Sequence, residues 1–318
     1  MSCVRSVPCL TRSARLIVSL LAAAALSATP AAHRDENPWH RFTWFAAQLG
    51  GEHIARLAIH VPVTLEGLSG EHHLQLDTGA SHTVLHGGTL HDLNPAFVAA
   101  GRAMAVSGTI AGVEVTNETV GLMPDVRATV VRGTPAPVVG SLGLSFFAQR
   151  ILVLDYPGER FMVLPKGAEL PDRLEQRAQF LPTTLRNGKL YVPVSIDGHA
   201  RTDIFFDTGA SAFALITSPK RWRALTGLQG TESSTRRRTG SSWDTDLTLI
   251  GAPMQGQLAV GPAVVERPVV WHTTDSRFSF SHWPDTSGFI GNEIFDDRFI
   301  VILDLSRRRF GMASHAEP

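Results

Sequence analysis

One five-residue string occurs twice in the chain. Asp-Thr-Gly-Ala-Ser stands at residues 77–81 and again at residues 207–211. Each copy follows an apolar run, at residues 74–76 (LQL) and 204–206 (IFF). At average residue usage, a chance second copy of a given five-letter string has a probability of roughly one in a thousand or less. The repeat therefore indicates two carboxylates, each on a tight Gly turn at the end of a buried strand.

The two copies have a chemical rationale. A buried strand delivers its last side chain, here Asp77 or Asp207, to one point with little freedom. Glycine then lets the backbone turn sharply and brings its N–H close to the carboxylate. The Thr and Ser hydroxyls can hydrogen-bond the neighbouring backbone or the acid itself. A single Asp-Thr-Gly is also an ordinary turn sequence, so the functional interpretation depends on the duplication.

The chain repeats itself around these strings. Each copy of the repeated unit is called a pass. The first pass opens at residues 61–67 (VPVTLEG) and the second at residues 192–198 (VPVSIDG), and both patterns predict a strand, a turn at Gly and a second strand. Each pass closes with two apolar residues and Gly, a short helix, and a hairpin that carries Leu-Asp and Arg-Phe at matching offsets. Self-similarity of this quality indicates duplication. The closing motifs are Val138-Val139-Gly140 with residues 151–155 and 160–161, and Phe289-Ile290-Gly291 with residues 300–304 and 309–310.

Length and composition predict an all-β protein of two lobes with a few short helices. The chain has 318 residues, enough for two core-bearing domains, and its 28 Gly and 19 Pro are typical of a turn-rich chain. Residues 51–165 are assigned to an N-terminal lobe, 166–182 to a charged linker and 183–315 to a C-terminal lobe. Residues 32–50 form a lead-in, for which a helix is one option.

The N-terminus resembles a secretory signal peptide, at residues 1–31. Three arginines precede an apolar stretch at residues 16–26, and small residues follow it. A membrane anchor is the alternative, but this stretch is shorter than the ~20 residues that a spanning helix needs. Both cysteines, Cys3 and Cys9, precede the apolar stretch and would leave with the signal peptide. We therefore expect an exported, periplasmic or secreted protein without disulfides, thiol catalysis or a stable membrane anchor.

Charge and histidine usage exclude some other classes of function. The 29 basic and 29 acidic residues balance, which gives no electrostatic case for nucleic acid or an anionic membrane. His72 and His73 are adjacent on a predicted strand and point to opposite faces, so they cannot share a metal. We expect no metal and no cofactor, and histidines on the polar surface or at the rim of a cleft. The arginines at residues 236–238 read as solvated loop charges.

Taken together, these motifs resemble the aspartic proteases. Asp-Thr-Gly-Ala-Ser at a strand end, followed by apolar-apolar-Gly and a short helix, is the pattern in question. Ala80, Ala210 and the compact passes are more similar to the retropepsin branch than to pepsin. Two such passes after a signal peptide resemble the bacterial periplasmic aspartyl proteases with fused retropepsin-like lobes. The resemblance extends from about residue 54 to residue 312.

The resemblance assigns roles to individual residues. Asp77 and Asp207 would form the catalytic dyad, without any metal or nucleophilic side chain. The supporting residues have three expected roles: Thr78 and Thr208 interlock across the lobe interface, Gly79, Gly209, Ser81 and Ser211 support the carboxylates, and Val138, Val139, Gly140, Phe289, Ile290 and Gly291 pack behind the acid loops.

The resemblance also implies a mechanism. Two carboxylates about 3 Å apart share a proton over a wide pH range, which is established behaviour of aspartic proteases. The ionised acid takes a proton from a water molecule while the protonated acid polarises the scissile carbonyl. Pepsin-like chains usually have a hydroxyl residue at the positions of Ala80 and Ala210. That hydroxyl can donate to the carboxylate and lower its pKa, and alanine cannot. We therefore expect activity at mildly acidic to neutral pH.

A mobile flap over the cleft is expected from the family. The candidate is the hairpin at residues 106–113, with Gly108, Thr109 and Ile110 near its tip. Its counterpart would lie near residues 240–243 and include Trp243. Neither segment has the Tyr of pepsin-like flaps, since the two tyrosines of the chain are Tyr156 and Tyr191.

The sequence therefore predicts a monomeric aspartic endopeptidase that hydrolyses a peptide or protein substrate with an intramolecular dyad. Two alternatives stay open. The same cleft could serve a catalytically silent peptide-binding module, or each lobe could pair with a lobe of another chain.

Overall fold

The computed structural model describes residues 38–98, 101–128, 136–232, 234–242, 245–273, 275, 280 and 285–315. Residues Pro38–Pro318 form one compact unit. The expected signal peptide at residues 1–31, residues 32–37 of the lead-in and the flap candidate Trp243 lie outside the described residues.

Strands dominate the fold, which confirms the predicted all-β class. The first pass builds a seven-stranded sheet around β4, the strand that ends at Asp77. The order of this sheet is β2 (Thr43–Leu49), β3 (Glu52–Leu65), β4 (His72–Asp77), β8 (Val138–Gly143), β5 (Val84–His86), β7 (Val113–Met123) and β6 (Ala103–Ile110).

The second pass builds two sheets. The larger contains β16, the strand that precedes Asp207, and the smaller packs beside it. The larger has the order β12 (Thr184–Arg186), β13 (Lys189–Tyr191), β16 (Ile204–Phe206), β23 (Gly288–Ile290), β17 (Leu215–Thr217), β22 (Val269–Thr273), β19 (Thr245–Pro253) and β18 (Arg236–Ser242). The smaller has the order β15 (His199–Arg201), β14 (Val194–Ile196), β20 (Gln257–Val260) and β21 (Ala263–Glu266).

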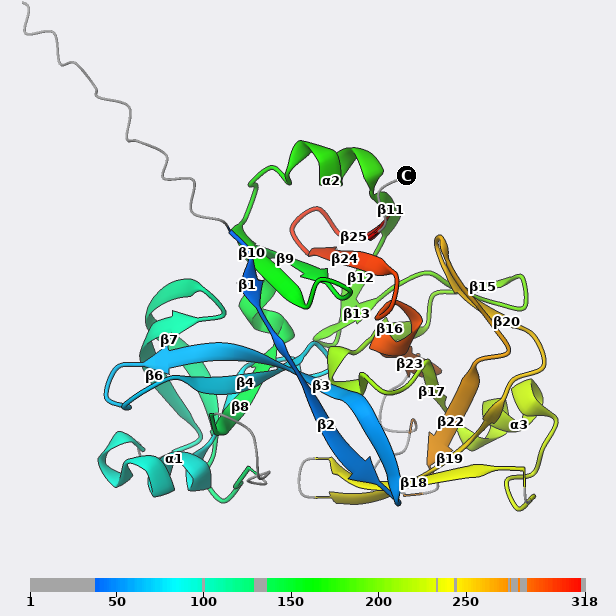
Figure 1. The fold of residues 1–318 in the computed structure, drawn as a ribbon, viewed down its shortest axis with the longest axis horizontal. Helices are drawn as coiled ribbons and strands as arrows, with labels where there is room; N and C mark the ends of the chain where they lie inside the picture. Colours follow the sequence, from blue (N-terminus) through cyan, green and yellow to red (C-terminus); the bar gives the residue numbers. More distant parts are fainter. Residues whose placement is uncertain are drawn as a thin grey trace, which may run out of the picture. The chain divides into compact units, whose positions relative to one another are not determined.

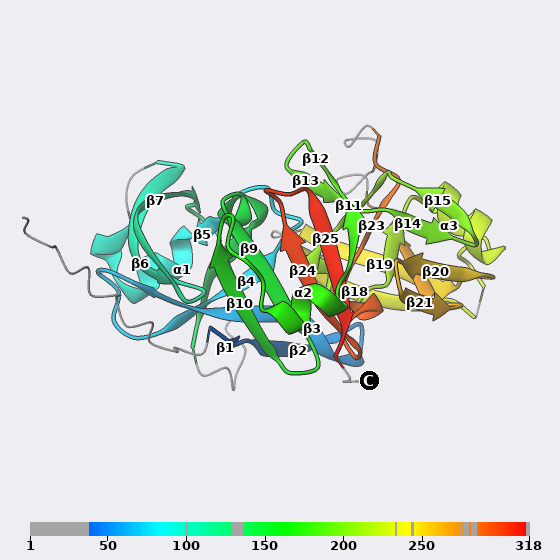
Figure 2. The same ribbon diagram turned by 90° about the horizontal axis from the view of Figure 1, so that it is seen from above.

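A fourth sheet, of six strands, is shared by the two passes. At its centre β9 pairs antiparallel with β24, so that Val153 lies opposite Ile302. Figures 1 and 2 show these green and red strands between the blue-to-cyan strands of the first pass and the yellow-to-orange strands of the second. The order is β1 (His40–Arg41), β10 (Arg160–Pro165), β9 (Arg150–Asp155), β24 (Phe299–Asp304), β25 (Arg309–Ser314) and β11 (Gln179–Pro182).

The matching hairpins of the shared sheet each carry a buried Asp. Asp155 accepts hydrogen bonds from the Gly158 N–H (3.1 Å) and from Nε of Arg160 (2.7 Å). Asp304 accepts from the Ser306 hydroxyl (2.8 Å) and from Nε of Arg309 (3.0 Å). These repeated acids fix hairpin turns.

The α-helices of the described residues are short. They are α1 (Gly87–Leu93), α2 (Asp172–Arg177) and α3 (Pro219–Thr226). Helix α3 has clear boundaries in the sequence, since the Ser218 side chain accepts from the Arg221 N–H, Pro219 follows, and Gly227 ends the helix at φ 74°. Among the described residues, no helix is long and apolar enough to cross a membrane.

The lead-in differs from expectation, and the linker takes part in the shared sheet. A helix in the lead-in is wrong, because residues 40–41 and 43–49 form β1 and β2. Tertiary pairing overrides local preference there, since β2 pairs along β3 and the Trp44 ring stacks on Tyr156 at 6.1 Å. The charged linker contains α2 and the strand β11, which pairs with β25. It is therefore an integral part of the shared sheet.

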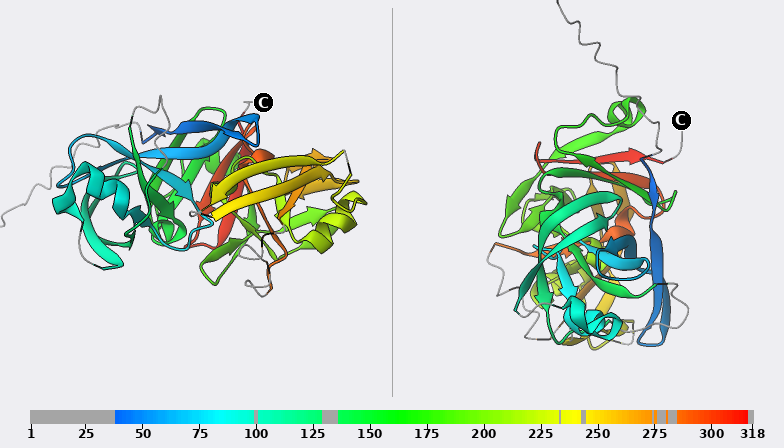
Figure 3. Two further views of the ribbon diagram at one scale, coloured as in Figure 1. Left: turned by 90° about the horizontal axis from the view of Figure 1, so that it is seen from below. Right: turned by 90° about the vertical axis from the view of Figure 1, so that its left-hand side faces the viewer.

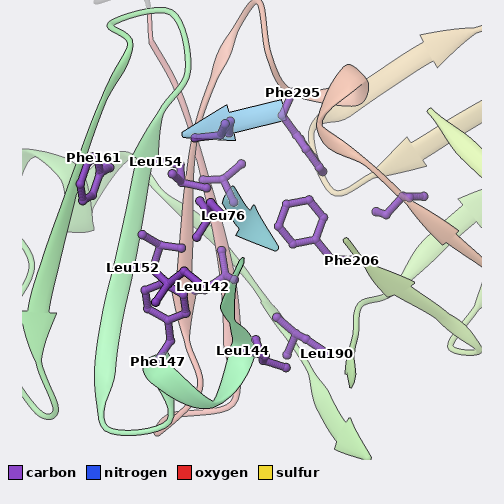
Figure 4. Packing of buried hydrophobic residues seen from close by; sticks show 14 of the residues in the cluster. Leu76, Leu142, Leu144, Phe147, Leu152, Leu154, Phe161, Leu190, Phe206 and Phe295 are labelled. Atoms are coloured by element: carbon purple, nitrogen blue, oxygen red, sulfur yellow. The ribbon is translucent and has the colours of Figure 1, made fainter. Parts of the chain in front are cut away.

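The main core lies beneath the two acids. Leu76 and Phe206, the residues directly before Asp77 and Asp207, are fully buried in one cluster. Figure 4 shows them with Leu142, Leu190 and Phe295. Phe206 makes edge-to-face contact with Phe295, with ring centroids 5.7 Å apart. The apolar runs before the acids therefore anchor both acid loops in a common core.

Candidate active site

Each acid is held by the same arrangement of paired strands. Strand β4 runs parallel to β8, and β16 runs parallel to β23. Asp77 pairs with Gly143 at the end of β4. At the matching position, the Asp207 N–H donates to the Ile290 carbonyl at 2.9 Å. Because the backbone of both acids is fixed by a neighbouring strand, their side chains leave the sheets at defined points.

The two acid loops are joined by a reciprocal interlock of threonines. The Thr78 N–H donates to Oγ1 of Thr208 at 2.9 Å, and the Thr208 N–H donates to Oγ1 of Thr78 at 3.0 Å. The Thr78 hydroxyl donates to the Phe206 carbonyl (3.1 Å) and the Thr208 hydroxyl to the Leu76 carbonyl (2.9 Å). Both threonines are 0% exposed. Four buried hydrogen bonds therefore fix the position of one loop against the other.

The two carboxylates converge on the glycines of the loops. A Cβ atom built on Gly209 would lie 2.7 Å from Oδ1 of Asp77 and 3.1 Å from Oδ1 of Asp207. A Cβ atom on Gly79 would overlap the Asp207 carboxylate. Each acid therefore reaches across to the other loop, and only glycine leaves room for it.

Backbone N–H groups bind both carboxylates. The Ala80 N–H donates to Oδ1 of Asp77 at 2.9 Å, and the Gly209 N–H donates to Oδ1 of Asp207 at 2.8 Å. The Gly79 N–H also lowers the pKa of Asp77 by hydrogen bonding. The glycines thus lie where the resemblance implied, with Ala80 as a further donor that was not expected.

Burial raises the pKa of both acids, and the charge of Asp77 raises that of Asp207 further. Asp77 is only 7% exposed, and its burial is the main cause of its raised pKa. For Asp207, burial and then the charge of Asp77 raise the pKa to about 7. Lys189 opposes the shift at both acids. The two groups interact strongly, so their protons belong to the pair, which holds one proton up to near-neutral pH.

The two serines have different surroundings, and the support that they were expected to give the carboxylates is not what the structure shows. The Ser211 hydroxyl donates to the Thr208 carbonyl at 2.8 Å, within the second loop. The Ser81 hydroxyl lies 2.9 Å from Nδ1 of His82, near the surface. Ser81 and Ser211 therefore have different hydrogen-bond partners, although they occupy the same position in the repeated string.

Tyr156 and Asn292 support the second loop and were missed from the sequence. The Tyr156 hydroxyl donates to Oδ1 of Asn292 at 2.7 Å. Nδ2 of Asn292 donates to Oγ of Ser211 (2.7 Å) and to the Thr208 carbonyl (3.2 Å). Asn292 directly follows Gly291, but its partner lies 136 positions away. A contact of that separation leaves no trace in a single sequence.

The apolar-apolar-Gly motif expected to pack behind the first acid loop was assigned to the wrong residues. Leu142 and Gly143 pair with Leu76 and Asp77, as Ile290 pairs with Phe206. Val138 instead pairs with His73, near the start of β4. The counterpart of Phe289-Ile290-Gly291 is therefore Ser141-Leu142-Gly143, and Val138-Val139-Gly140 lies three residues too early.

A Gly-Xaa-Xaa-Gly string in both passes would have given the correct alignment. Gly140 and Gly143 of the first pass correspond to Gly288 and Gly291 of the second. Gly140 pairs with Leu85 on β5, and Gly288 pairs with Thr217 on β17. A Cβ atom at any of these four glycines would overlap backbone atoms of the neighbouring segment. The apolar-apolar-Gly pattern failed because Ser141 occupies an apolar position.

The first flap candidate is built into the sheet. Gly108, Thr109 and Ile110 pair with residues 65, 64 and 63 of β3. Val63 also pairs with His72, at the opposite end of β4 from Asp77. Ile110 and Ala111 are 1% exposed. The structure therefore gives no support to a mobile flap at this hairpin, because its tip packs in the core at the far end of β4.

A different hairpin reaches the first acid loop. Strands β12 and β13 are joined by Asn187 and Gly188, whose φ angles of 50° and 67° are typical of a tight hairpin turn. A Cβ atom on Gly188 would lie 2.5 Å from Cβ of Ser81. Lys189 follows, and its Nζ donates to the Gly79 carbonyl. The Asn-Gly pair predicts such a turn, but nothing in the sequence indicates that the turn lies on the acid loop.

Arg238 links the second acid loop to the β2–β3 hairpin. The expectation of a solvated charge is wrong, since Arg238 is 8% exposed. It donates from Nε and a terminal nitrogen to Glu52, at 2.9 and 3.1 Å. Its other terminal nitrogen donates to the Ala212 carbonyl at 2.9 Å, directly after Ser211. Figure 3 shows the yellow β18–β19 hairpin beside the blue β2 and β3.

Three histidines of β3 and β4 are buried, namely His60, His72 and His73. His72 and His73 are buried on β4, so their expected place at a surface or rim is wrong, whereas His82 is exposed. Burial, and then the neighbouring His73, lowers the pKa of His60 to about 4, which keeps this side chain neutral. Within the part of the chain that the structure describes, no group of three His, Cys, Asp or Glu could hold a metal ion.

Comparisons with known proteins give likeness in structure only. No family model and no curated protein sequence matches the chain. The solved structures that it is similar to include conglutin gamma from lupine seeds, with a TM-score of 0.47 and 11% identity over 87% of this chain and 95% of that chain. The aspartic proteinase from Irpex lacteus has a TM-score of 0.45 and 14% identity over 81% and 94%. Basic 7S globulin from soybean has a TM-score of 0.42 and 11% identity over 86% and 96%.

Proposed function

We propose that this protein is an aspartic endopeptidase with Asp77 and Asp207 as its catalytic dyad. The observation that carries the proposal is the convergence of both carboxylates on Gly209, within two loops that are joined by the threonine interlock. Two acids in contact and out of bulk water share one proton. This arrangement supplies a base and an acid at the same point, as peptide hydrolysis requires.

The proposed reaction uses only the dyad and a water molecule. In the substrate complex, the ionised acid takes a proton from water while the water oxygen bonds to the scissile carbonyl carbon. The protonated acid meanwhile donates to the carbonyl oxygen, which gives a neutral tetrahedral diol. The acid that took the water proton then donates it to the amide nitrogen, and the ionised acid takes a proton from one diol hydroxyl. The C–N bond breaks, the carboxylic acid and amine products leave, and the dyad again holds one proton. The roles of acid and base belong to the pair and are not divided between Asp77 and Asp207.

The proposed substrate is an extended peptide or protein segment. Such a segment would bind by backbone hydrogen bonds and alternating side-chain pockets. Both acids come from one chain, which supports a monomeric enzyme. Export to the periplasm or beyond the cell is part of the proposal, and it rests on the pattern of residues 1–31.

A cleavage assay tests the proposed function. The purified chain without residues 1–31 is incubated with a diverse peptide library between pH 3 and pH 8, with and without a pepstatin-type inhibitor. Asp77→Asn and Asp207→Asn should each lose at least about 1000-fold in rate while retaining the fold. Asp297→Asn, an exposed acid of the second pass, is the matched control and should retain full rate.

Two outcomes would contradict the proposal. Binding of peptides without cleavage at any pH would favour the catalytically silent module. Activity that falls with dilution of the enzyme would indicate that the dyad forms between chains. The second result is checked by sedimentation at the assay concentration.

A further inference from the structure

A pocket opens beside the first acid loop. Its volume is about 310 Å³, near the lower end of the range for ligand pockets and suited to one side chain. Five of its residues follow Asp77 on the first pass, and the sixth comes from β13 of the second. The lining residues are Gly79, Ala80, Ser81, His82, Val84 and Lys189. Ala80 donates to the Asp77 carboxylate and Gly79 lies against that of Asp207. An occupant of this pocket would therefore lie next to the scissile bond.

Lys189 is held in this pocket from two sides. Its Nζ donates to the Gly79 carbonyl, which ties it to the acid loop. The same atom lies 5.2 Å from the centroid of the Phe205 ring. The tight turn at Asn187 and Gly188 fixes the start of β13 against Ser81. The position of the ammonium group is therefore set by the fold rather than by a flexible loop.

The charges around the pocket favour an anion. Lys189 places an ammonium group on the pocket wall, and His82 stands beside Ser81 as a second nitrogen donor or acceptor. The other lining residues are uncharged. The acids that face Lys189 are Asp77 and Asp207, and they share one proton, so the pair carries about one negative charge. Lys189 therefore interacts with the dyad and also lines the pocket, so a substrate carboxylate in the pocket would meet its ammonium group.

We propose that Lys189 determines specificity, and that the pocket takes an Asp or Glu side chain of the substrate adjacent to the scissile bond. The ammonium group would form a charge-assisted hydrogen bond with the substrate carboxylate. This inference rests on the proposed endopeptidase function, since it names the substrate class of that site.

Matched peptides and variants of Lys189 test the inference. Peptides that differ only in Glu, Gln or Lys are compared at each position that flanks the scissile bond. The wild type should have about ten-fold higher kcat/KM for Glu than for Gln at one of these positions. Lys189→Arg should retain this ratio, Lys189→Met should bring it close to one, and Lys189→Glu should favour the Lys peptide. Lys220→Met, which removes an exposed lysine of α3, is the control and should leave the ratio unchanged.

Two results would overturn the inference. One is a Glu preference that survives in Lys189→Met. The other is an equal loss for Glu and Gln peptides, with the acid limb of the pH–rate profile moved to higher pH, because Lys189 would then act on the dyad alone. Should the Met and Glu variants fail to fold, the wild type decides, since the ratio should fall towards one in 0.5 M salt.

Binding of uncleavable peptides separates this inference from the proposed function. Peptides with a reduced amide at the scissile position, again as Glu and Gln pairs, are titrated into the wild type by calorimetry. A protein that cleaves nothing but binds the Glu peptide about ten-fold more tightly would refute the hydrolytic function and retain the pocket. A protein that cleaves peptides but binds the Glu and Gln peptides equally would retain the hydrolytic function and refute the pocket's preference for an acidic side chain.

Discussion

The two acid loops have identical sequences and different surroundings. The second loop is braced from within, because Ser211, Asn292 and Tyr156 form a buried chain of hydrogen bonds behind it. The first loop borders a pocket, and its Ser81 lies beside the exposed His82. The shared letters determine the interlock and the aim of the carboxylates. The residues outside the motif therefore decide which loop is rigid support and which loop faces a ligand.

The largest effect is expected where the two loops are equivalent. Thr78→Val and Thr208→Val each remove a hydroxyl that donates one buried hydrogen bond and accepts another. Each should lower the free energy of unfolding by about 2–4 kcal/mol, since a backbone N–H is left buried without its acceptor. Urea unfolding measures both values. A difference above about 1 kcal/mol between the two variants would show that the interlock is not symmetrical in energy.

The next effect concerns the dependence of stability on pH. The pKa of Asp207 rises from 3.8 to about 7 on folding. A carboxyl group with a raised folded pKa contributes its full stability below about pH 4 and loses that contribution as the pH rises towards 7. Asp207→Asn should therefore flatten this part of the curve and be more stable than the wild type at pH 7, by about 1–3 kcal/mol.

Two other acids of the second pass also have raised pKa values, so the slopes of stability against pH are compared between the wild type and the variant. Desolvation raises the pKa of Asp296, which is half-buried, to about 6, and that of Glu293, which keeps an exposed surface, to about 7. Both acids are present in the wild type and in Asp207→Asn, so they contribute equally to the two curves. Unfolding by urea at half-unit steps from pH 4 to pH 8 measures the difference. Parallel curves would mean that the dyad holds no extra proton in the folded state.

The smallest effect tests the difference between the loops directly. Ser211→Ala removes a buried hydroxyl that accepts from Asn292 and donates to Thr208, and should cost about 1–2 kcal/mol. Ser81→Ala removes a hydroxyl near the surface and should cost less than about 0.5 kcal/mol. The two variants are a matched pair because the local sequence is the same. Equal losses in thermal or urea unfolding would contradict the asymmetry described here.

The sequence predicted what repeats and missed what is unique. The two copies of Asp-Thr-Gly-Ala-Ser predicted a pair of acids, composition predicted the all-β fold, and the resemblance to aspartic proteases added the interlocked threonines. The backing motif was misplaced by three residues where Ser141 breaks the apolar pattern. A helix was one option for the lead-in because the spacing of its aromatic residues suits a helix or a strand. The pairing of β2 with β3 decides for the strand.

Contacts between distant positions account for the other misses. Lys189 and Gly79 are 110 residues apart, and Arg238 and Glu52 are 186 apart. Neither pair follows a spacing rule, so no periodicity in the sequence could have joined them. The flap candidate failed for a related reason, since its glycines suit a mobile tip but the pairing of residues 108–110 with β3 fixes them.

The shared sheet has a consequence for the two halves of the chain. Strand β9 of the first half pairs along its length with β24 of the second, from Ile151–Asp304 to Asp155–Ile300. Separated from each other, the halves would each expose the edge of a buried, apolar strand, which is a template for association. The first half expressed alone should therefore join a second copy of itself edge to edge, and mixing the two halves should restore a heterodimer.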